Sequence, residues 1–187
     1  MDERIPGGKV LRVVAEDGPD RLSPDDSRIL NLESATITGH TLKLLILEPG
    51  SGPLDLDALR NTVAQRLVAE PLATRRVDTT GPDPRWLATG DFDIAHHVRR
   101  APTPDLASEA DLWRIVSALM YEHLNRARPL WTFDVIGPLA DRREAIAVRI
   151  HHAMADGIAC VRFLESVLFD EHPDPPHGEG GHRAGVR

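Results

Sequence analysis

The sequence has 187 residues, of which 41% are hydrophobic and 27% are charged, so it suits one compact domain with tails rather than two full domains. The formal charge is −7 and the only lysines are Lys9 and Lys43, which excludes the basic field typical of a nucleic-acid partner. The single cysteine, Cys160, excludes an intrachain disulfide and favours a reducing compartment.

No targeting or membrane-spanning segment is predicted. Lys43 interrupts the best apolar stretch, 42–47, which is far shorter than the roughly 18 residues of a membrane span. The first six residues carry two acids and no apolar segment follows them, which is unlike a secretory signal. We therefore expect a cytoplasmic protein, and peripheral attachment to a membrane or lipid droplet stays open.

Three segments of the first half follow clear patterns. Ser23 followed by Pro24 predicts the start of a short helix over 23–33. The β-branched and aliphatic residues of 36–47 predict a core strand. An aspartate cap and an apolar stripe predict a second helix over 55–70.

The second half alternates short extended pieces with helices. Ser108 predicts the start of a helix that runs to about Arg126. A turn at 137–141 predicts that strands over 131–136 and 144–150 form a hairpin at the heart of a sheet. Three shorter extended pieces are predicted at 75–77, 85–88 and 97–101.

These patterns divide the chain into an N-terminal arm over 1–22, a domain over 23–170 and a tail over 171–187. The tail is rich in proline, glycine, histidine and charge, and cannot bury enough apolar area to offset its ordering entropy, so we expect disorder there. The domain is predicted to be α+β, with helices packed on a mixed β-sheet.

The sequence from His151 to Gly157, His-His-Ala-Met-Ala-Asp-Gly, joins the last predicted strand to the last predicted helix. Successive side chains on a strand face opposite sides, so His152 should share the inward face of the apolar residues in 144–150 while His151 faces away. Asp156 is a predicted helix N-cap, and it could also fix an arginine. Gly157 would permit a tight turn.

His152 is therefore the candidate general base, because an imidazole with an ordinary pKa of about 6.5 can take a proton near neutral pH. His151 is a secondary candidate. The competing interpretation is a histidine that is simply hydrogen-bonded in the core. A metal site at His152 and Asp156 would need a helix that begins before residue 152, where the sequence predicts strand, so we expect no metal.

Four stretches in the right order resemble one family. They are Leu22–Asp25; Trp86 with Phe92-Asp93 and His97–Arg99; Arg128-Pro129-Leu130-Trp131; and Ile150–Gly157. Over 22–170 the chain resembles the N-terminal half of the bacterial wax ester synthase/diacylglycerol acyltransferase family, in the group that includes chloramphenicol acetyltransferase and condensation domains.

The resemblance implies one half of a two-half fold and an O-acyltransferase. His152 would take the proton of a hydroxyl acceptor, diacylglycerol or a long-chain alcohol, which attacks the thioester of acyl-CoA without a covalent acyl-enzyme. Acyl-CoA is then a co-substrate and no further cofactor is implied. Asp156 and Gly157 would shape the motif, and His151 would be the less essential partner. Trp86 and Trp131 are expected to be core aromatics.

The family also has a second half of comparable size, and nothing after Phe169 resembles it. Two hypotheses follow. The chain is an acyltransferase that completes its site with a separate C-terminal half or by self-association with another copy. Alternatively, it is a catalytically incomplete remnant or a regulatory interaction module of the same fold.

Overall fold

A computed structural model describes residues 20–169 of the chain. Its centre is a four-stranded sheet with the strand order β1-β6-β5-β4. The strands are β1 (His40–Leu47), β6 (Glu144–His151), β5 (Trp131–Ile136) and β4 (Val98–Arg100). The first three run antiparallel and β4 is parallel to β5, so the sheet is mixed, as predicted.

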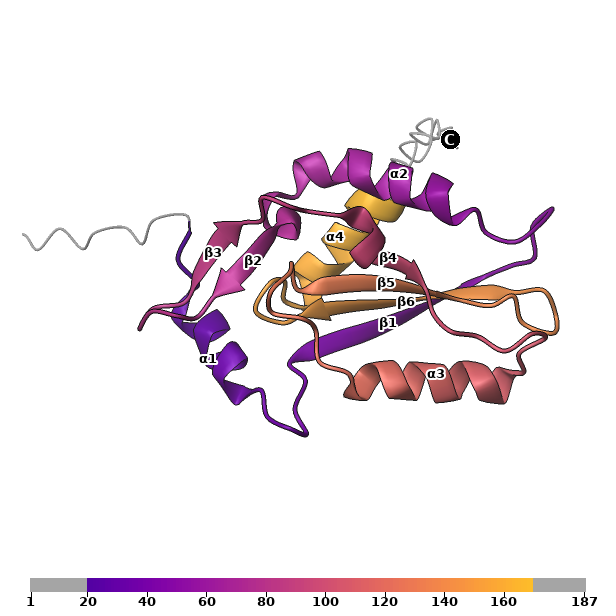
Figure 1. Ribbon diagram of the computed structural model, residues 1–187, viewed down its shortest axis with the longest axis horizontal. Coiled ribbons are helices and arrows are strands. Elements are labelled where there is room, and N and C mark those ends of the chain that lie inside the picture. Colours follow the sequence, from indigo (N-terminus) through magenta and orange to yellow (C-terminus); the bar gives the residue numbers. More distant parts are fainter. Residues whose placement is uncertain (1–19, 170–187) are drawn as a thin grey trace, which may run out of the picture.

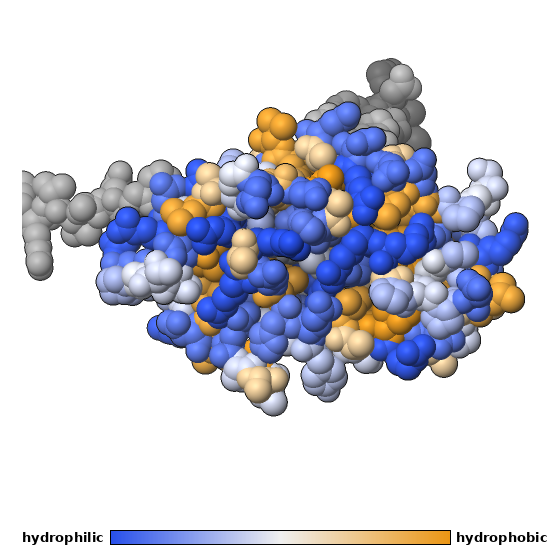
Figure 2. All heavy atoms as spheres, viewed as in Figure 1, coloured by the Kyte–Doolittle hydropathy of each residue, from blue (hydrophilic) through white to orange (hydrophobic). Residues whose placement is uncertain are grey.

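Helices cover both faces of this sheet (Figure 1). In the same view, hydrophilic residues cover most of the visible surface and smaller hydrophobic areas lie between them (Figure 2). α2 (Leu56–Arg66) and α4 (Gly157–Leu168) pack on one face and α3 (Glu109–Tyr121) packs on the other. α1 (Pro24–Leu32) and a small sheet of β2 (Arg75–Asp78) and β3 (Arg85–Ala88) lie at one end. Three short 3-10 turns, Leu67–Ala69, Pro71–Thr74 and Ile94–His96, link these elements. The predicted α+β class is confirmed.

The hairpin of β5 and β6 is the heart of the sheet, as predicted, because every residue of both strands is buried. On β6 the branched residues Ile146, Val148 and Ile150 face α2 and α4, whereas Ala145 and Ala147 face α3. The small alanines leave room for α3 to approach the sheet.

The prediction of a core strand over 36–47 was wrong in position. β1 begins at His40 and pairs only with β6 among residues 20–169, so within this range it is an edge strand. Its residues are mostly half-buried, and Ile46 is exposed. Burial of a strand depends on neighbours that are distant in sequence, which its own composition does not reveal.

Helix starts follow the predicted caps. The Ser108 side chain accepts from the Asp111 amide in a complete capping box, Ser23 caps α1, and Asp55 caps α2. The predicted end of the third helix was wrong, because α3 stops at Tyr121 rather than Arg126. Its last carbonyls turn toward a buried arginine, Arg149.

Arg149 is almost fully buried, and its guanidinium is hydrogen-bonded to backbone carbonyls and to side chains of β5. Its guanidinium donates to the carbonyls of Leu119 and Glu122 at 3.0 Å, to Thr132 Oγ1 at 3.1 Å and to Asp134 Oδ2 at 3.2 Å. Because a buried charge is tolerated only when it is paired and hydrogen-bonded, this network fixes the end of α3 against β5 and β6.

The expected arm and tail fall largely outside the described residues. The tail over 171–187 and residues 1–19 of the arm lie there, so the predicted disorder stays a prediction. Residues 20–22 belong to the folded domain: Leu22 is buried, and its amide donates to the Pro84 carbonyl at 3.2 Å.

Two buried histidines should make the fold sensitive to acid. Burial lowers the pKa of His40 and of His97 from 6.5 to about 4. Between these values the unfolded state binds more protons, so stability is complete above about pH 6.5 and falls as the pH decreases toward 4. Because one pKa unit corresponds to about 1.4 kcal/mol, each histidine would lower the free energy of unfolding by roughly 3 kcal/mol across this window.

Urea unfolding at several pH values measures this effect. Neither ring nitrogen of His40 has a hydrogen-bond partner among the described residues, so His40→Leu should be tolerated at pH 7.5 and should flatten the pH dependence. His96→Gln is the control, because His96 is largely exposed. An unchanged pH dependence in His40→Leu would contradict the prediction.

Candidate active site

The turn that carries the two histidines is tied to both neighbouring strands. The His151 amide donates to the Leu130 carbonyl at 3.0 Å, and the His152 amide donates to the Gly39 carbonyl at 2.9 Å. The His151 carbonyl accepts from the amides of Met154 and Ala155, at 2.9 and 3.2 Å. These bonds close a tight turn between the end of β6 and the start of α4.

The His151 ring is fully buried and both of its nitrogens are occupied. Nδ1 accepts a hydrogen bond from the Ala153 amide at 3.0 Å, so this nitrogen is unprotonated. The proton is therefore on Nε2, which donates to Glu33 Oε1 at 2.9 Å. Burial lowers the pKa of His151, and the Glu33 carboxylate opposes this effect. His151 therefore stays neutral at neutral pH and cannot easily take up a proton.

The sequence predicted that His152 would be the enclosed histidine, and this was wrong. The strand ends at His151, so the alternation of faces does not extend to His152. The face of β6 that carries Arg149 and His151 is also buried. Because both faces of the strand are buried, the alternation of side chains along it could not show which histidine is enclosed. His152 lies in the turn and is half-buried, and within residues 20–169 its ring nitrogens make no hydrogen bond.

Asp156 caps α4, as predicted. Its Oδ1 accepts from the Ala159 amide at 2.8 Å, and its side chain makes no ion pair with an arginine of the described chain. Gly157 is the first residue of the helix and does not have positive φ, and a Cβ there would meet no atom within 4 Å. The tight turn that Gly157 was expected to permit is present, but it does not depend on the conformational freedom of glycine at this position.

Trp86 and Trp131 are core residues, as expected. Trp131 is fully buried at the start of β5, its Nε1 donates to the Ala73 carbonyl at 2.8 Å, and its ring stacks on His97 with centroids 4.6 Å apart. Trp86 packs with Leu22 and Leu30 beneath α1. Trp131 follows Leu130, whose carbonyl holds the His151 amide, so this stretch supports the turn.

The predicted helix after the motif is present as α4. In the sequence its apolar residues recur with helical period at Ile158, Val161, Leu164, Val167 and Leu168, but the buried face differs from this set. Cys160, Phe163, Leu164 and Val167 are buried, whereas Ile158 and Val161 are 68% and 45% exposed. The buried Cys160 lies 3.0 Å from the Lys43 ammonium on β1. Two large apolar side chains thus lie exposed on the first turns after the motif.

The sequence alone did not identify Glu33 and Arg126. Glu33 follows α1 and reaches His151 across 118 positions, while the Arg126 guanidinium donates to Glu33 Oε2 through Nε, at 2.8 Å, and through Nη2. No local spacing links these residues. In the sequence, Glu33 and Arg126 are simply an acidic and a basic residue, each next to a short apolar segment.

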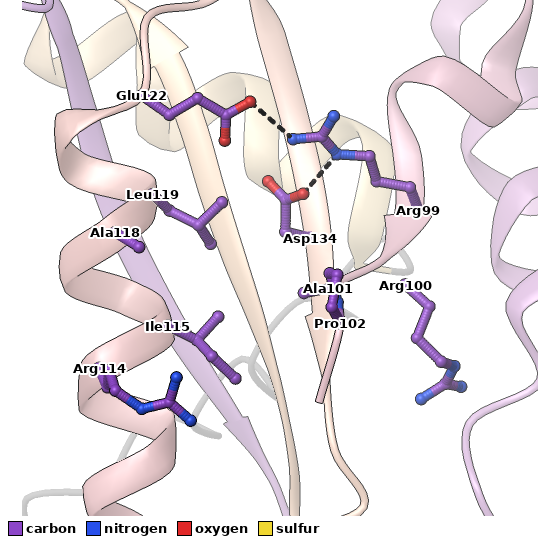
Figure 3. Close-up of a pocket in the computed structure, with 10 residues that line it drawn as sticks. All are labelled: Arg99, Arg100, Ala101, Pro102, Arg114, Ile115, Ala118, Leu119, Glu122 and Asp134. Atoms are coloured by element: carbon purple, nitrogen blue, oxygen red, sulfur yellow. Dashed lines mark hydrogen bonds and ion pairs between the residues drawn. The ribbon is translucent and has the colours of Figure 1, made fainter. Parts of the chain in front are cut away.

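A pocket of about 620 Å³ lies away from the histidines, between α3 and the β4–β5 edge. Figure 3 shows Arg99, Arg100 and Arg114 around it, with Glu122 and Asp134. Arg99 pairs with Asp134 and Glu122, Arg100 with Glu144 and Arg114 with Asp111. Its cationic groups are thus already neutralised, and neither His151 nor His152 lines it.

Residues 20–169 offer neither a metal site nor a membrane-spanning helix. They contain no group of three or more histidine, cysteine or acidic side chains arranged to hold a metal ion. None of their helices is long and apolar enough to cross a membrane.

The family model of the wax ester synthase/diacylglycerol acyltransferase catalytic domain matches residues 22–185 of the chain. The chain belongs to this family. The match extends beyond residue 170, where the sequence patterns had placed the end of the domain.

Known proteins agree with this membership. A Mycobacterium tuberculosis protein named "probable diacylglycerol O-acyltransferase" is 38% identical over 133 residues, which are 68% of this chain and 28% of that protein. The wax ester synthase/diacylglycerol acyltransferase of Marinobacter aquaeolei VT8 matches with a TM-score of 0.62 and 26% identity, over 76% of this chain and 36% of that one.

Condensation domains share the fold of this acyltransferase-family chain. A variant of the starter condensation domain of rhizomide synthetase RzmA in complex with C8-CoA matches with a TM-score of 0.60 and 15% identity, over 78% of this chain and 33% of that one. The predicted likeness to this fold group is confirmed. The acyltransferase-family chain spans about one third of the length of these relatives.

The capping role of Asp156 can be tested by stability. Asp156→Ala removes the acceptor for the Ala159 amide and should lower the free energy of unfolding by about 1 kcal/mol, whereas Asp156→Asn should retain most of it. Gly157→Ala, at an open position, is the matched control and should be neutral or slightly stabilising. A loss well above 3 kcal/mol in Asp156→Ala would show a buried interaction instead of a cap.

Proposed function

We propose that this chain is the histidine-bearing part of an O-acyltransferase that moves a fatty acyl group from acyl-CoA to the hydroxyl of diacylglycerol or a long-chain alcohol. His152 is the general base. One observation carries this assignment: both ring nitrogens of His151 are already hydrogen-bonded, to Glu33 and to the Ala153 amide. His152 is therefore the histidine of the motif whose ring can accept a proton from a substrate. Family membership supplies the class of reaction.

In the proposed reaction, His152 removes the hydroxyl proton of the acceptor as its oxygen attacks the thioester carbonyl. The tetrahedral intermediate collapses and expels the CoA sulfur as a thiolate. The thiolate takes the proton back from His152, so the products are an ester and CoA with a free thiol. The C8-CoA complex of a condensation domain supports acyl-CoA as a donor compatible with this fold.

The active species, we propose, is an assembly with a second half or with another copy of the chain. The Mycobacterium tuberculosis and Marinobacter aquaeolei relatives described above are about three times as long as the matched region, which supports a site shared with further polypeptide. Exposed Ile158 and Val161 beside the motif fit a surface that is covered in that assembly. Because the acceptor is a lipid, contact with a membrane or droplet surface is part of the proposal.

The assignment of the base is tested by substitution. His152→Ala should lower the rate of CoA release by a factor on the order of 10² to 10⁴, because proton transfer by a positioned side chain contributes about that much. His96→Ala, at an exposed histidine outside the motif, is the matched control. Equal rates for the wild type and His152→Ala under saturating palmitoyl-CoA and diacylglycerol would contradict the assignment.

The proposal of a shared site is tested by measuring the rate of CoA release at several protein concentrations. If the competent species is an assembly, the rate of CoA release per chain should rise with protein concentration or with added C-terminal half of a relative, because its population follows mass action. A constant rate per chain, unaffected by any addition, would show that the chain acts alone. Absence of CoA release under all of these conditions would instead favour the alternative of a non-catalytic module.

A further inference from the structure

We propose that Glu33 is a positioning residue for the acyl transfer, which acts by fixing the tautomer of His151 and thereby the turn that presents His152. The inference rests on the proposed function for its kinetic consequence. Its structural part concerns the turn alone and can be measured without turnover.

Glu33 is well placed to define a proton position. Its side chain is 8% exposed at the C-terminal end of α1, and one carboxylate oxygen accepts the His151 Nε2 proton at 2.9 Å. The other oxygen accepts from Arg126, whose Nη2 also donates to the Leu30 carbonyl at 2.7 Å. A carboxylate held by a guanidinium that is itself tied to α1 has little freedom to rotate.

The tautomer of His151 decides whether the turn is held. With the proton on Nε2, Nδ1 presents its lone pair to the Ala153 amide, the residue directly after His152. Without the Glu33 acceptor the proton can move to Nδ1, which would then oppose the N–H of Ala153, donor against donor. The bonds from His151 to Leu130 and from His152 to Gly39 would remain, so we expect a local loss of order near His152.

Gly39 leaves the space that this contact needs. It has φ of +68°, and a Cβ at this position would clash with His151 Nε2 and approach the Glu33 side chain. Gly39 thus occupies a position that only glycine can fill, next to the buried side chains of Glu33 and His151. These three residues lie around one hydrogen bond.

The first experiment compares Glu33→Gln with Glu33→Ala. The glutamine keeps a carbonyl oxygen that can accept the Nε2 proton, so kcat should fall by no more than about 5-fold, whereas the alanine should lower kcat by about 10- to 100-fold with KM changed less than about 3-fold. Glu48→Ala, at an exposed acid after β1, is the matched control. Equal losses in the alanine and glutamine variants, or unchanged kcat in both, would overturn the proposal.

The second experiment reads the turn directly by amide hydrogen exchange. In Glu33→Ala the Ala153 amide should exchange at least 10-fold faster than in the wild type, relative to the β5–β6 amides, and Glu33→Gln should restore the protection. Unchanged protection in Glu33→Ala would overturn the positioning role even if activity were lost. If the wild type shows no turnover but the Ala153 amide exchanges faster in Glu33→Ala, the role of Glu33 in holding the turn is upheld and the proposed function is not. If Glu33→Ala does not fold, Glu33→Asp replaces it, because the shorter side chain withdraws the acceptor while keeping the charge.

Discussion

The hydrogen bond between His151 and Glu33 is the contact on which the candidate site depends. It joins the end of β6 to the end of α1 across 118 residues, and Arg126 holds the acid in place from the segment after α3. Such a contact is stable only when the rest of the fold has brought its three segments together. In return, it gives the turn before α4 one defined geometry, so His152 is presented by fixed backbone rather than by a free loop.

A second buried network lies on the same face of β6. Arg149 and Asp134 are each 1% exposed, and the arginine also holds two carbonyls at the end of α3. Buried ion pairs add little to stability when desolvation is counted, but the loss of one partner is costly. The network therefore specifies where α3 ends, and the segment that follows is directed toward Glu33. The Arg149–Asp134 network and the His151–Glu33 network thus bury charged groups on a face of β6 where apolar residues are usual.

The sequence predicted local features well because their causes are local. Caps at Ser23, Asp55, Ser108 and Asp156 lie within three residues of the amides that they bind, and the β5–β6 hairpin follows from a short turn between two apolar runs. The turn between β6 and α4 also lies where the sequence predicted it. These features require no knowledge of tertiary contacts.

The errors about burial have one physical origin, which is that the burial of a residue is set by neighbours distant in sequence. Strand parity failed for His152 because both faces of β6 are covered, and β1 appeared to be a core strand because composition does not reveal an edge. The same holds for Ile158, which continues an apolar period but faces outward. Glu33 left no local pattern at all, because its partner is reached only in the folded chain.

The roles proposed for the two histidines can be tested most directly by long-range ¹H–¹⁵N NMR of the imidazole nitrogens. His151 should show the neutral tautomer with the proton on Nε2 and should keep it as the pH is lowered through 6.5, because burial lowers its pKa. A proton on Nδ1, or uptake of a second proton at the ordinary pKa of about 6.5, would contradict the assignment of His151 to structure and of His152 to chemistry.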